Sequence, residues 1–292
     1  MQTLFRFLSH WPLGLLHAIG FFLGWATWWA SPTYRRRFRE NVAQSGLPWS
    51  AVRPAVGAAG KMVMELPWLW FRPADRPLGD KVRWLNSELI EEAKRQGRGV
   101  IFLTPHLGCF EVTAQSYAEL FTEPGKPITV LYRPARKAAI RPIVETARRR
   151  PGLAAAPASL AGVRQMIRAL RQGQAVGLLP DQVPPEGLGV WAPFLGRPAY
   201  TMTLASRLAQ QTGAAVLLVW GERLPRGRGY VVRVDALEPA LPEGGADQAQ
   251  SAAALINRAM ERLILQCPEQ YLWGYHRYKE PRHDTALSGG AT

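Results

Sequence analysis

Short apolar runs alternate with amphipathic stretches along most of this chain. From residue 82 onward, apolar runs bounded by Gly or Pro predict strands, and apolar positions three or four residues apart predict helices between them. Strands separated by helices are typical of an α/β domain with a mixed, mainly parallel sheet flanked by helices. The expected strands span residues 100–104, 128–132, 175–179, 214–222 and 230–235, and the expected helices span residues 34–41, 51–71, 87–96, 111–121, 140–150, 160–172, 201–212 and 248–266.

An apolar run of twenty residues lies near the start of the chain, at residues 11–30, where His17 and Thr27 are the only polar types. That length is enough to cross a bilayer, and it also suits a buried helix or a helix that lies in the membrane surface. A cleaved signal peptide would have a shorter apolar region with basic residues before it, whereas the basic cluster at residues 35–39 follows the run. Positive charge on that flank predicts that the remainder of the chain stays in the cytoplasm.

The composition limits the possible function classes. The 292 residues suffice for one large domain with a sizeable core, and the formal net charge of +14 suits an anionic partner. Two cysteines provide no disulfide framework. The sequence contains no G-x-S-x-G elbow, no P-loop, no H-E-x-x-H motif and no Cys/His spacing typical of zinc sites. No helix-turn-helix or RNP-like stretch accompanies the basic charge, so we expect no nucleic-acid function.

The strongest candidate for chemistry is His106. An apolar run bounded by Gly99 and Pro105 reads as a buried strand, which places His106 in a strand-to-helix turn, where many α/β folds carry their chemistry. Glu111 follows five residues later, so the two side chains can meet only if His106 precedes the helix and Glu111 belongs to its first turns. A carboxylate on one imidazole nitrogen would leave the other as a general base for a hydroxyl group. A chance pairing without a catalytic role is the alternative.

Four blocks in order carry a family resemblance. Residues 104–111 read Thr-x-His-x-Gly-x-x-Glu, residues 131–134 read Leu-Tyr-Arg-Pro, residues 178–199 contain Asp-Gln and then Phe-Leu-Gly-Arg-Pro-Ala, and residues 271–279 contain Trp, His, Arg and Lys. Together they resemble the lipid A biosynthesis (late) acyltransferases, a family of the wider lysophospholipid acyltransferase group. The resemblance covers most of residues 10–280.

The resemblance implies an acyltransferase of class EC 2.3.1 that acts in lipopolysaccharide biosynthesis. It would transfer a fatty acyl chain from acyl carrier protein, or from acyl-CoA, to a hydroxyl of a lipid A precursor. His106 would be the general base, and Glu111 would fix its tautomer and stabilise the imidazolium. Arg133 would bind an anionic group, with a structural ion pair as the alternative, and Asp181 would hold Arg133 or an acceptor sugar, with a turn cap as the alternative. The resemblance implies no metal and no cofactor.

Two further features have competing interpretations. A Cys109–His106 nucleophile pair would be a different chemistry, but the family has no nucleophile at that place in the motif, so we expect direct attack of the acceptor on the thioester. The expected basic helix at residues 140–150 contains Arg141 and Arg148–Arg150. It is either a solvated face or a surface that seats an acidic acyl carrier protein or anionic lipid.

We therefore expect a membrane-anchoring helix at residues 1–33, an acyltransferase domain at residues 34–284 and a flexible tail at residues 285–292. The expected location is the cytoplasmic face of the inner membrane. The alternatives are an acyltransferase for another glycolipid or aminolipid, and a non-catalytic membrane-bound lipid-binding protein, which the intact His106 and Glu111 disfavour. The acyl chain length, the acceptor position, the choice of donor and the oligomeric state stay open.

Overall fold

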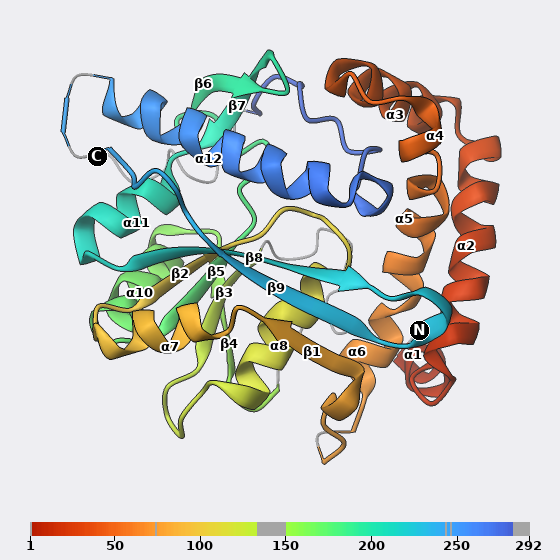
Figure 1. The fold of residues 1–292 in the computed structure, drawn as a ribbon, viewed down its shortest axis with the longest axis horizontal. Helices are drawn as coiled ribbons and strands as arrows, with labels where there is room; N and C mark the ends of the chain where they lie inside the picture. Colours follow the sequence, from red (N-terminus) through yellow and green to blue (C-terminus); the bar gives the residue numbers. More distant parts are fainter. Residues whose placement is uncertain (1, 74, 133–149, 243, 246, 283–292) are drawn as a thin grey trace.

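The computed structural model describes residues 2–73, 75–132, 150–242, 244–245 and 247–282. At its centre is a seven-stranded sheet with the strand order β1-β9-β8-β2-β5-β3-β4 (Figure 1). All neighbouring strands are parallel except β8 and β9, so the expected mixed, mainly parallel α/β architecture is confirmed. The strands are β1 Val82–Leu85, β2 Val100–Leu103, β3 Ile128–Tyr132, β4 Leu153–Pro157, β5 Ala175–Leu178, β8 Ala215–Arg223 and β9 Tyr230–Ala236.

Helices cover both faces of the sheet because each buried strand is apolar on both sides. On β2, Ile101 and Leu103 belong to the core formed with α10, α11 and α12, whereas Val100 and Phe102 belong to the core formed with α7 and α8. Alternate residues of a strand point to opposite faces, so a continuous apolar run is what a strand buried between two layers requires. The helices are α7 Glu88–Arg95, α8 Phe110–Leu120, α10 Leu160–Arg171, α11 Leu204–Thr212 and α12 Gln248–Gln266.

The segment before the sheet forms a separate layer of helices beside it (Figure 1, right). Residues 51–71, expected as one helix, are divided among three, because Pro54 precedes the second and Pro67 stands in the first turn of the third. Within the described part of the chain, one helix, α2, is long and apolar enough to cross a membrane. The helices are α1 Gln2–Leu8, α2 Leu13–Ala30, α3 Pro32–Ser45, α4 Trp49–Val52, α5 Ala55–Met64 and α6 Leu66–Phe71.

The structure contains strands that the sequence pattern did not predict. A separate antiparallel hairpin of β6 Gly189–Phe194 and β7 Arg197–Met202 lies above the sheet. Both strands contain proline, and the apolar pattern predicts no strand at either position. Leu195 and Gly196 have positive φ angles of 48° and 76° and form a two-residue turn suited to a hairpin. β4 was also missed, since its Leu-Ala-Ala-Ala-Pro sequence lacks β-branched residues. Apart from Arg150, the helix expected at residues 140–150 lies outside the described residues, as does the tail at residues 285–292.

Candidate active site

The turn that carries His106 connects β2 to α8, as expected. Its backbone is held on two sides. The N–H of Leu272 donates to the carbonyl oxygen of His106 at 3.1 Å, and the N–H of Cys109 donates to the carbonyl oxygen of Gly221 at 2.7 Å. Gly108 has a φ angle of +57°, and a Cβ there would lie 2.0 Å from the oxygen of Gly221. The glycine of the motif is therefore required by the close approach of β8.

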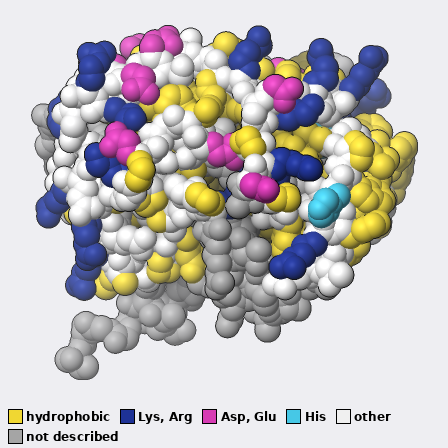
Figure 2. Space-filling model, turned by 90° about the horizontal axis from the view of Figure 1, so that it is seen from below, with side chains coloured by type: hydrophobic (Ala, Val, Ile, Leu, Met, Phe, Trp, Pro, Cys, Tyr) yellow, Lys and Arg dark blue, Asp and Glu magenta, His cyan; other side chains and the backbone are white. Residues whose placement is uncertain are grey.

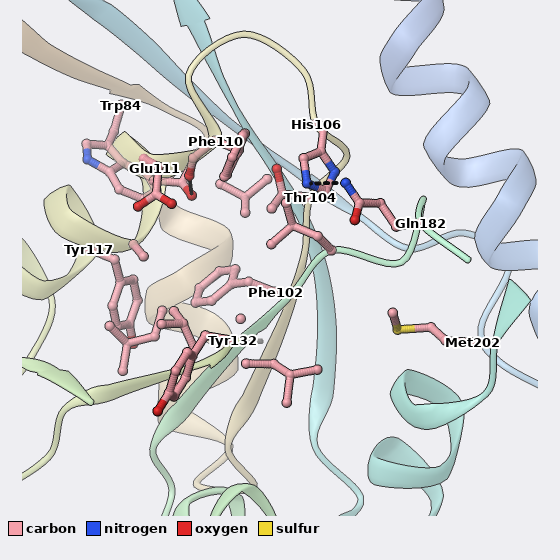
Figure 3. Close-up of a pocket in the computed structure, with 18 residues that line it drawn as sticks. Trp84, Phe102, Thr104, His106, Phe110, Glu111, Tyr117, Tyr132, Gln182 and Met202 are labelled. Atoms are coloured by element: carbon pink, nitrogen blue, oxygen red, sulfur yellow. Dashed lines mark hydrogen bonds between the residues drawn. The ribbon is translucent and has the colours of Figure 1, made fainter. Parts of the chain in front are cut away.

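The side chain of His106 is oriented by the residues that follow β5. Its Nδ1 lies 2.7 Å from Oδ1 of Asp181, and its backbone N–H donates to Oδ2 of the same carboxylate at 2.8 Å. The Asp181 carboxylate accepts only, so Nδ1 carries the proton and Nε2 has the free lone pair. The side-chain amide of Gln182 donates to Nε2 at 2.9 Å (Figure 3). The arrangement thus holds a histidine whose outward nitrogen is able to accept a proton.

The electrostatics of the pair favour an ionised carboxylate. Asp181 is buried, which by itself raises its pKa, but the electrostatic attraction to the His106 ring and the hydrogen bonds from that ring and from the His106 backbone outweigh this and lower the pKa below its ordinary value. An ionised Asp181 stabilises positive charge on the imidazole. This is the state that the ring would reach if it accepted a proton from a substrate.

Glu111 occupies a different position from the one that its spacing suggested. It lies in the first turn of α8, and its Oε2 accepts a hydrogen bond from the indole N–H of Trp70 at 3.2 Å. The structure gives the Nδ1 contact of His106 to Asp181 instead. The ring of Phe110 packs against the imidazole with 4.8 Å between ring centroids, and Figure 3 shows it between the imidazole and the Glu111 carboxylate. Both His106 and Glu111 nevertheless line the same cavity.

This cavity has a volume of about 330 Å³ and extends from His106 along the face of the sheet covered by α8. Most of its lining is apolar. Figure 3 shows His106 and Glu111 toward one end, with Phe102 and Tyr132 farther along. A pocket with a polar end and an apolar body suits a ligand that has a polar group at one end and an apolar portion beyond it. The other lining residues are Trp84, Thr104, Phe110, Thr113, Ala114, Tyr117, Ile128, Val130, Leu131, Gly177, Leu179, Gln182, Met202 and Val219.

A buried ion pair supports the His106 turn from behind. Arg223, near the end of β8, donates to both oxygens of Glu65, at 2.8 and 2.6 Å, and to the carbonyl oxygen of Gly108 at 2.9 Å. His17 Nε2 and the Tyr230 hydroxyl each lie 3.1 Å from Oε2 of Glu65. Burial by itself would raise the pKa of Glu65, but the charge and hydrogen bonds of Arg223, followed by those of His17, lower it to about 2. The network connects the N-terminal helices to the turn that bears the motif.

Cys109 has the properties of a packed thiol. It is buried, and burial, followed by the charge of Glu65, raises its pKa well above the ordinary value. A nucleophilic cysteine needs the opposite, a lowered pKa that yields a thiolate. The neighbouring His106 directs its polar contacts to Asp181 and Gln182. These contacts agree with the expectation that Cys109 is not a nucleophile.

The remaining predicted site residues divide into those that the structure describes and those that it does not. Arg133, Arg141, Arg148 and Arg149 lie outside the described residues. Arg150 donates to the carbonyl oxygen of Arg72 at 2.9 Å. Sequence reasoning assigned Asp181 to Arg133, to a sugar or to a turn cap, and it did not single out Gln182 or Trp70. For Asp181 and Gln182 the one signal was the position of the Asp-Gln pair after an apolar strand.

The comparisons with known proteins converge on one family. The family profile described as "Bacterial lipid A biosynthesis acyltransferase" matches residues 49–280. The chain is 29% identical over 223 residues to the lipid A biosynthesis lauroyltransferase of Escherichia coli (strain K12), covering 76% of this chain and 69% of that protein. It is 28% identical over 224 residues to the lipid A biosynthesis palmitoleoyltransferase of the same organism, covering 75% and 68%. The profile match includes both the His106 turn and the Asp181 loop.

Proposed function

The chain belongs to the bacterial lipid A biosynthesis acyltransferase family, and on that basis we propose that it transfers a fatty acyl chain to a hydroxyl group of a lipid A precursor. Members of this family are acyltransferases, and the relatives named above differ in the acyl chain that their names specify. The donor in our proposal is a thioester, acyl carrier protein or acyl-CoA. The acceptor approaches from the membrane, and we place the reaction on the cytoplasmic face of the inner membrane.

The observation that carries the proposal is the pairing of His106 with Asp181 at the polar end of an apolar cavity. In the proposed reaction, Nε2 of His106 takes the proton of the acceptor hydroxyl as its oxygen attacks the thioester carbonyl carbon. The C–S bond then breaks, and the leaving thiolate takes the proton from Nε2. Asp181 keeps the proton on Nδ1 throughout and stabilises the transient imidazolium. General-base assistance of this kind is worth about 10²–10⁴-fold in rate.

Gln182 occupies the position that the acceptor needs. Its amide group donates to Nε2 of His106, and a hydroxyl donor can replace it there without leaving the nitrogen unsatisfied. We propose that the acceptor hydroxyl displaces this amide when it binds. Because one hydrogen-bond donor to Nε2 replaces another, the free-energy cost of displacing the Gln182 amide is small.

Glu111 keeps a role in the proposal as the second acidic residue of the cavity. Its carboxylate stands in the first turn of α8 and accepts from Trp70. A negative charge within the same cavity favours the imidazolium form of His106, which is part of the role first assigned to it. The other part, fixing the tautomer through Nδ1, belongs in this proposal to Asp181. We keep Arg133 as the proposed binder of an anionic group.

The apolar body of the cavity suits the acyl chain of the donor. Phe102, Ile128, Val130 and Tyr117 line it, and such a surface gains free energy by covering methylene groups, about 0.8 kcal/mol for each one removed from water. A sugar headgroup would gain little there, because its hydroxyls would lack partners. The acyl chain therefore occupies the cavity, and the sugar of the acceptor stays near His106.

Mass spectrometry of product lipids tests this function. The purified full-length protein in detergent is incubated with a lipid A precursor and, separately, with acyl carrier protein thioester or acyl-CoA. The proposal predicts a mass increase of one acyl chain on the precursor with at least one donor. It is contradicted if the precursor stays unchanged with both donors while a glycolipid or aminolipid of another class is acylated.

A further inference from the structure

Helix α2 is packed against the domain along a seam of glycines. A Cβ added at Gly20 would lie 2.6 Å from the oxygen of Gly60, and one added at Gly24 would lie 2.2 Å from the oxygen of Val56. The backbones of α2 and α5 are thus in direct contact. α5 in turn belongs to the domain, because Ala55 and Val56 are fully buried in the main core.

Both ends of α2 also touch the domain. Near its start, a Cβ on Gly14 would lie 3.0 Å from the carbonyl oxygen of Arg226, in the connection between β8 and β9. Near its end, the Trp28 ring packs on Phe38 with 5.3 Å between centroids. One turn after the start, His17 is buried against Glu65. The helix therefore contacts the rest of the protein from end to end.

This packing is incompatible with a helix that stands across a bilayer. The 18 residues of α2 span about 27 Å at 1.5 Å per residue, so the elements beside it would have to enter the hydrocarbon with it. Those elements carry Lys61, whose Cα would lie 2.7 Å from a Cβ added at Gly20 near the middle of α2, and the buried Glu65–Arg223 ion pair next to His17. Placing such charges at membrane depth is costly. This cost disfavours an orientation of α2 across the bilayer and favours one parallel to the membrane surface.

The outward face of α2 is apolar apart from Thr27. Three large side chains spaced seven residues apart lie on the same side of the helix. They are Leu15, Phe22 and Trp29, with exposures of 46%, 70% and 72%. Figure 2 shows hydrophobic side chains gathered at the side of the molecule where α1 and α2 lie, with Lys and Arg nearby. The other large hydrophobic side chains exposed within residues 2–64 are Leu4, Phe7, Phe21, Leu23, Trp49 and Val63.

The charge around this face identifies the kind of partner. Residues 1–64 contain seven Lys or Arg residues and a single acidic residue, Glu40. An apolar face surrounded by positive charge fits the headgroup and acyl boundary of an anionic membrane. A soluble protein partner would be expected to present complementary apolar surface of its own. The charge therefore favours lipid as the occupant.

We propose that α1 and α2 lie in the plane of one leaflet of an anionic membrane, so that residue 2 and the catalytic domain are on the same side of the bilayer. This inference does not depend on the reaction. It depends on the glycine seam, the end-to-end contacts of α2 and its apolar outer face. Of the arrangements that the sequence leaves open for this apolar run, the proposal selects the helix that lies in the membrane surface.

Cysteine labelling in inner-membrane vesicles tests the topology. Gln2 and Ser251 are exposed, on α1 and α12, and the native Cys109 and Cys267 are buried. Single variants Gln2→Cys and Ser251→Cys of the full-length protein are treated with a membrane-impermeant maleimide in inside-out and right-side-out vesicles, with solubilised protein as the reference for complete labelling. The proposal predicts that both positions label from the same side. Labelling of the two positions from opposite sides overturns it.

Vesicle flotation tests the occupant of the apolar face. The double variant Phe22→Ser/Trp29→Ser should bind vesicles of phosphatidylethanolamine and phosphatidylglycerol at least about tenfold more weakly than the unaltered protein, because two exposed aromatic anchors are lost. The matched control is Leu160→Ser, which removes a side chain of 72% exposure from α10 and should bind as the unaltered protein does. Unchanged vesicle binding of the double variant overturns the proposal. So does a purified protein that forms a dimer through this face and binds no vesicles.

Discussion

The carboxylate of Asp181 lies 2.7 Å from Nδ1 of His106, although the two residues are 75 positions apart in the chain. They meet because β2 and β5 are adjacent and parallel, so the segments that follow their carboxyl ends emerge at the same edge of the sheet. The same carboxylate also accepts the backbone N–H of His106. Asp181 therefore fixes both the ring and the turn that bears it.

Replacing Asp181 with Asn should lower kcat by about 10²–10⁴-fold, because the amide no longer stabilises an imidazolium and permits the wrong tautomer. The KM for the acyl donor should change little. Asp181→Glu should retain more activity than Asp181→Asn. The measurement is steady-state kinetics with a donor series, and the circular dichroism spectrum serves as the control for folding. A kcat close to that of the unaltered enzyme for Asp181→Asn would remove Asp181 from the chemistry.

Glu111→Ala should also reduce activity severely, and Glu111→Asp should reduce it less. The reason differs from that for Asp181, since Glu111 contacts Trp70 and lines the cavity. If Glu111 acts mainly through its charge, Glu111→Gln should be impaired nearly as much as Glu111→Ala. Trp70→Phe, which removes only the indole donor, is the matched control and should keep most of the activity. Full activity of Glu111→Gln would show that the charge is dispensable.

Acid should destabilise the protein through Glu65. Its pKa in the folded protein is about 2, against an ordinary value of 4.5. A lowered pKa means that the stabilisation is fully present above the ordinary value and is lost as the pH falls through 4.5 toward 2. Glu65→Gln should reduce the free energy of unfolding at neutral pH by about 3–5 kcal/mol, since it leaves Arg223 buried without its partner. It should also flatten the dependence of stability on pH below 4.5, which denaturation midpoints in a pH series will measure. If the stability of Glu65→Gln fell as steeply below pH 4.5 as that of the unaltered protein, Glu65 would not be the group responsible for the acid sensitivity.

At Gly24 of α2, packing and helix propensity predict opposite effects of an alanine substitution on stability. In an isolated helix, Gly24→Ala would add up to about 1 kcal/mol of stability. In this protein the new Cβ would lie 2.2 Å from the carbonyl oxygen of Val56, so we expect a loss of about 1–3 kcal/mol from overpacking. Thr27→Ala, at an exposed position of the same helix, should change the thermal midpoint little. A Gly24→Ala protein with a raised midpoint would mean that α2 does not pack on α5.

The sequence predicted what local patterns determine. Apolar runs bounded by Gly or Pro located the main strands, apolar positions three or four residues apart located the helices, and Pro105 placed His106 in a turn. The sequence did not predict Asp181 as the partner of His106. Spacing along one segment points to Glu111, whereas Asp181 is brought next to His106 by the pairing of two strands that are distant in the chain. Likewise, an apolar run has the same composition whether it spans a bilayer or packs on a domain. The close approach of the α2 glycines to Gly60 and Val56 of α5 becomes visible only when the two helices are placed together.

The turnover of His106→Ala tests whether His106 is the general base. Full-length protein with and without the substitution is incubated with a lipid A precursor and acyl carrier protein thioester, and the acylated product is quantified by mass spectrometry over time. The rate should fall by about 10²–10⁴-fold, while the thermal midpoint should show a folded protein. A folded His106→Ala enzyme that forms product at the rate of the unaltered enzyme would contradict this role of His106.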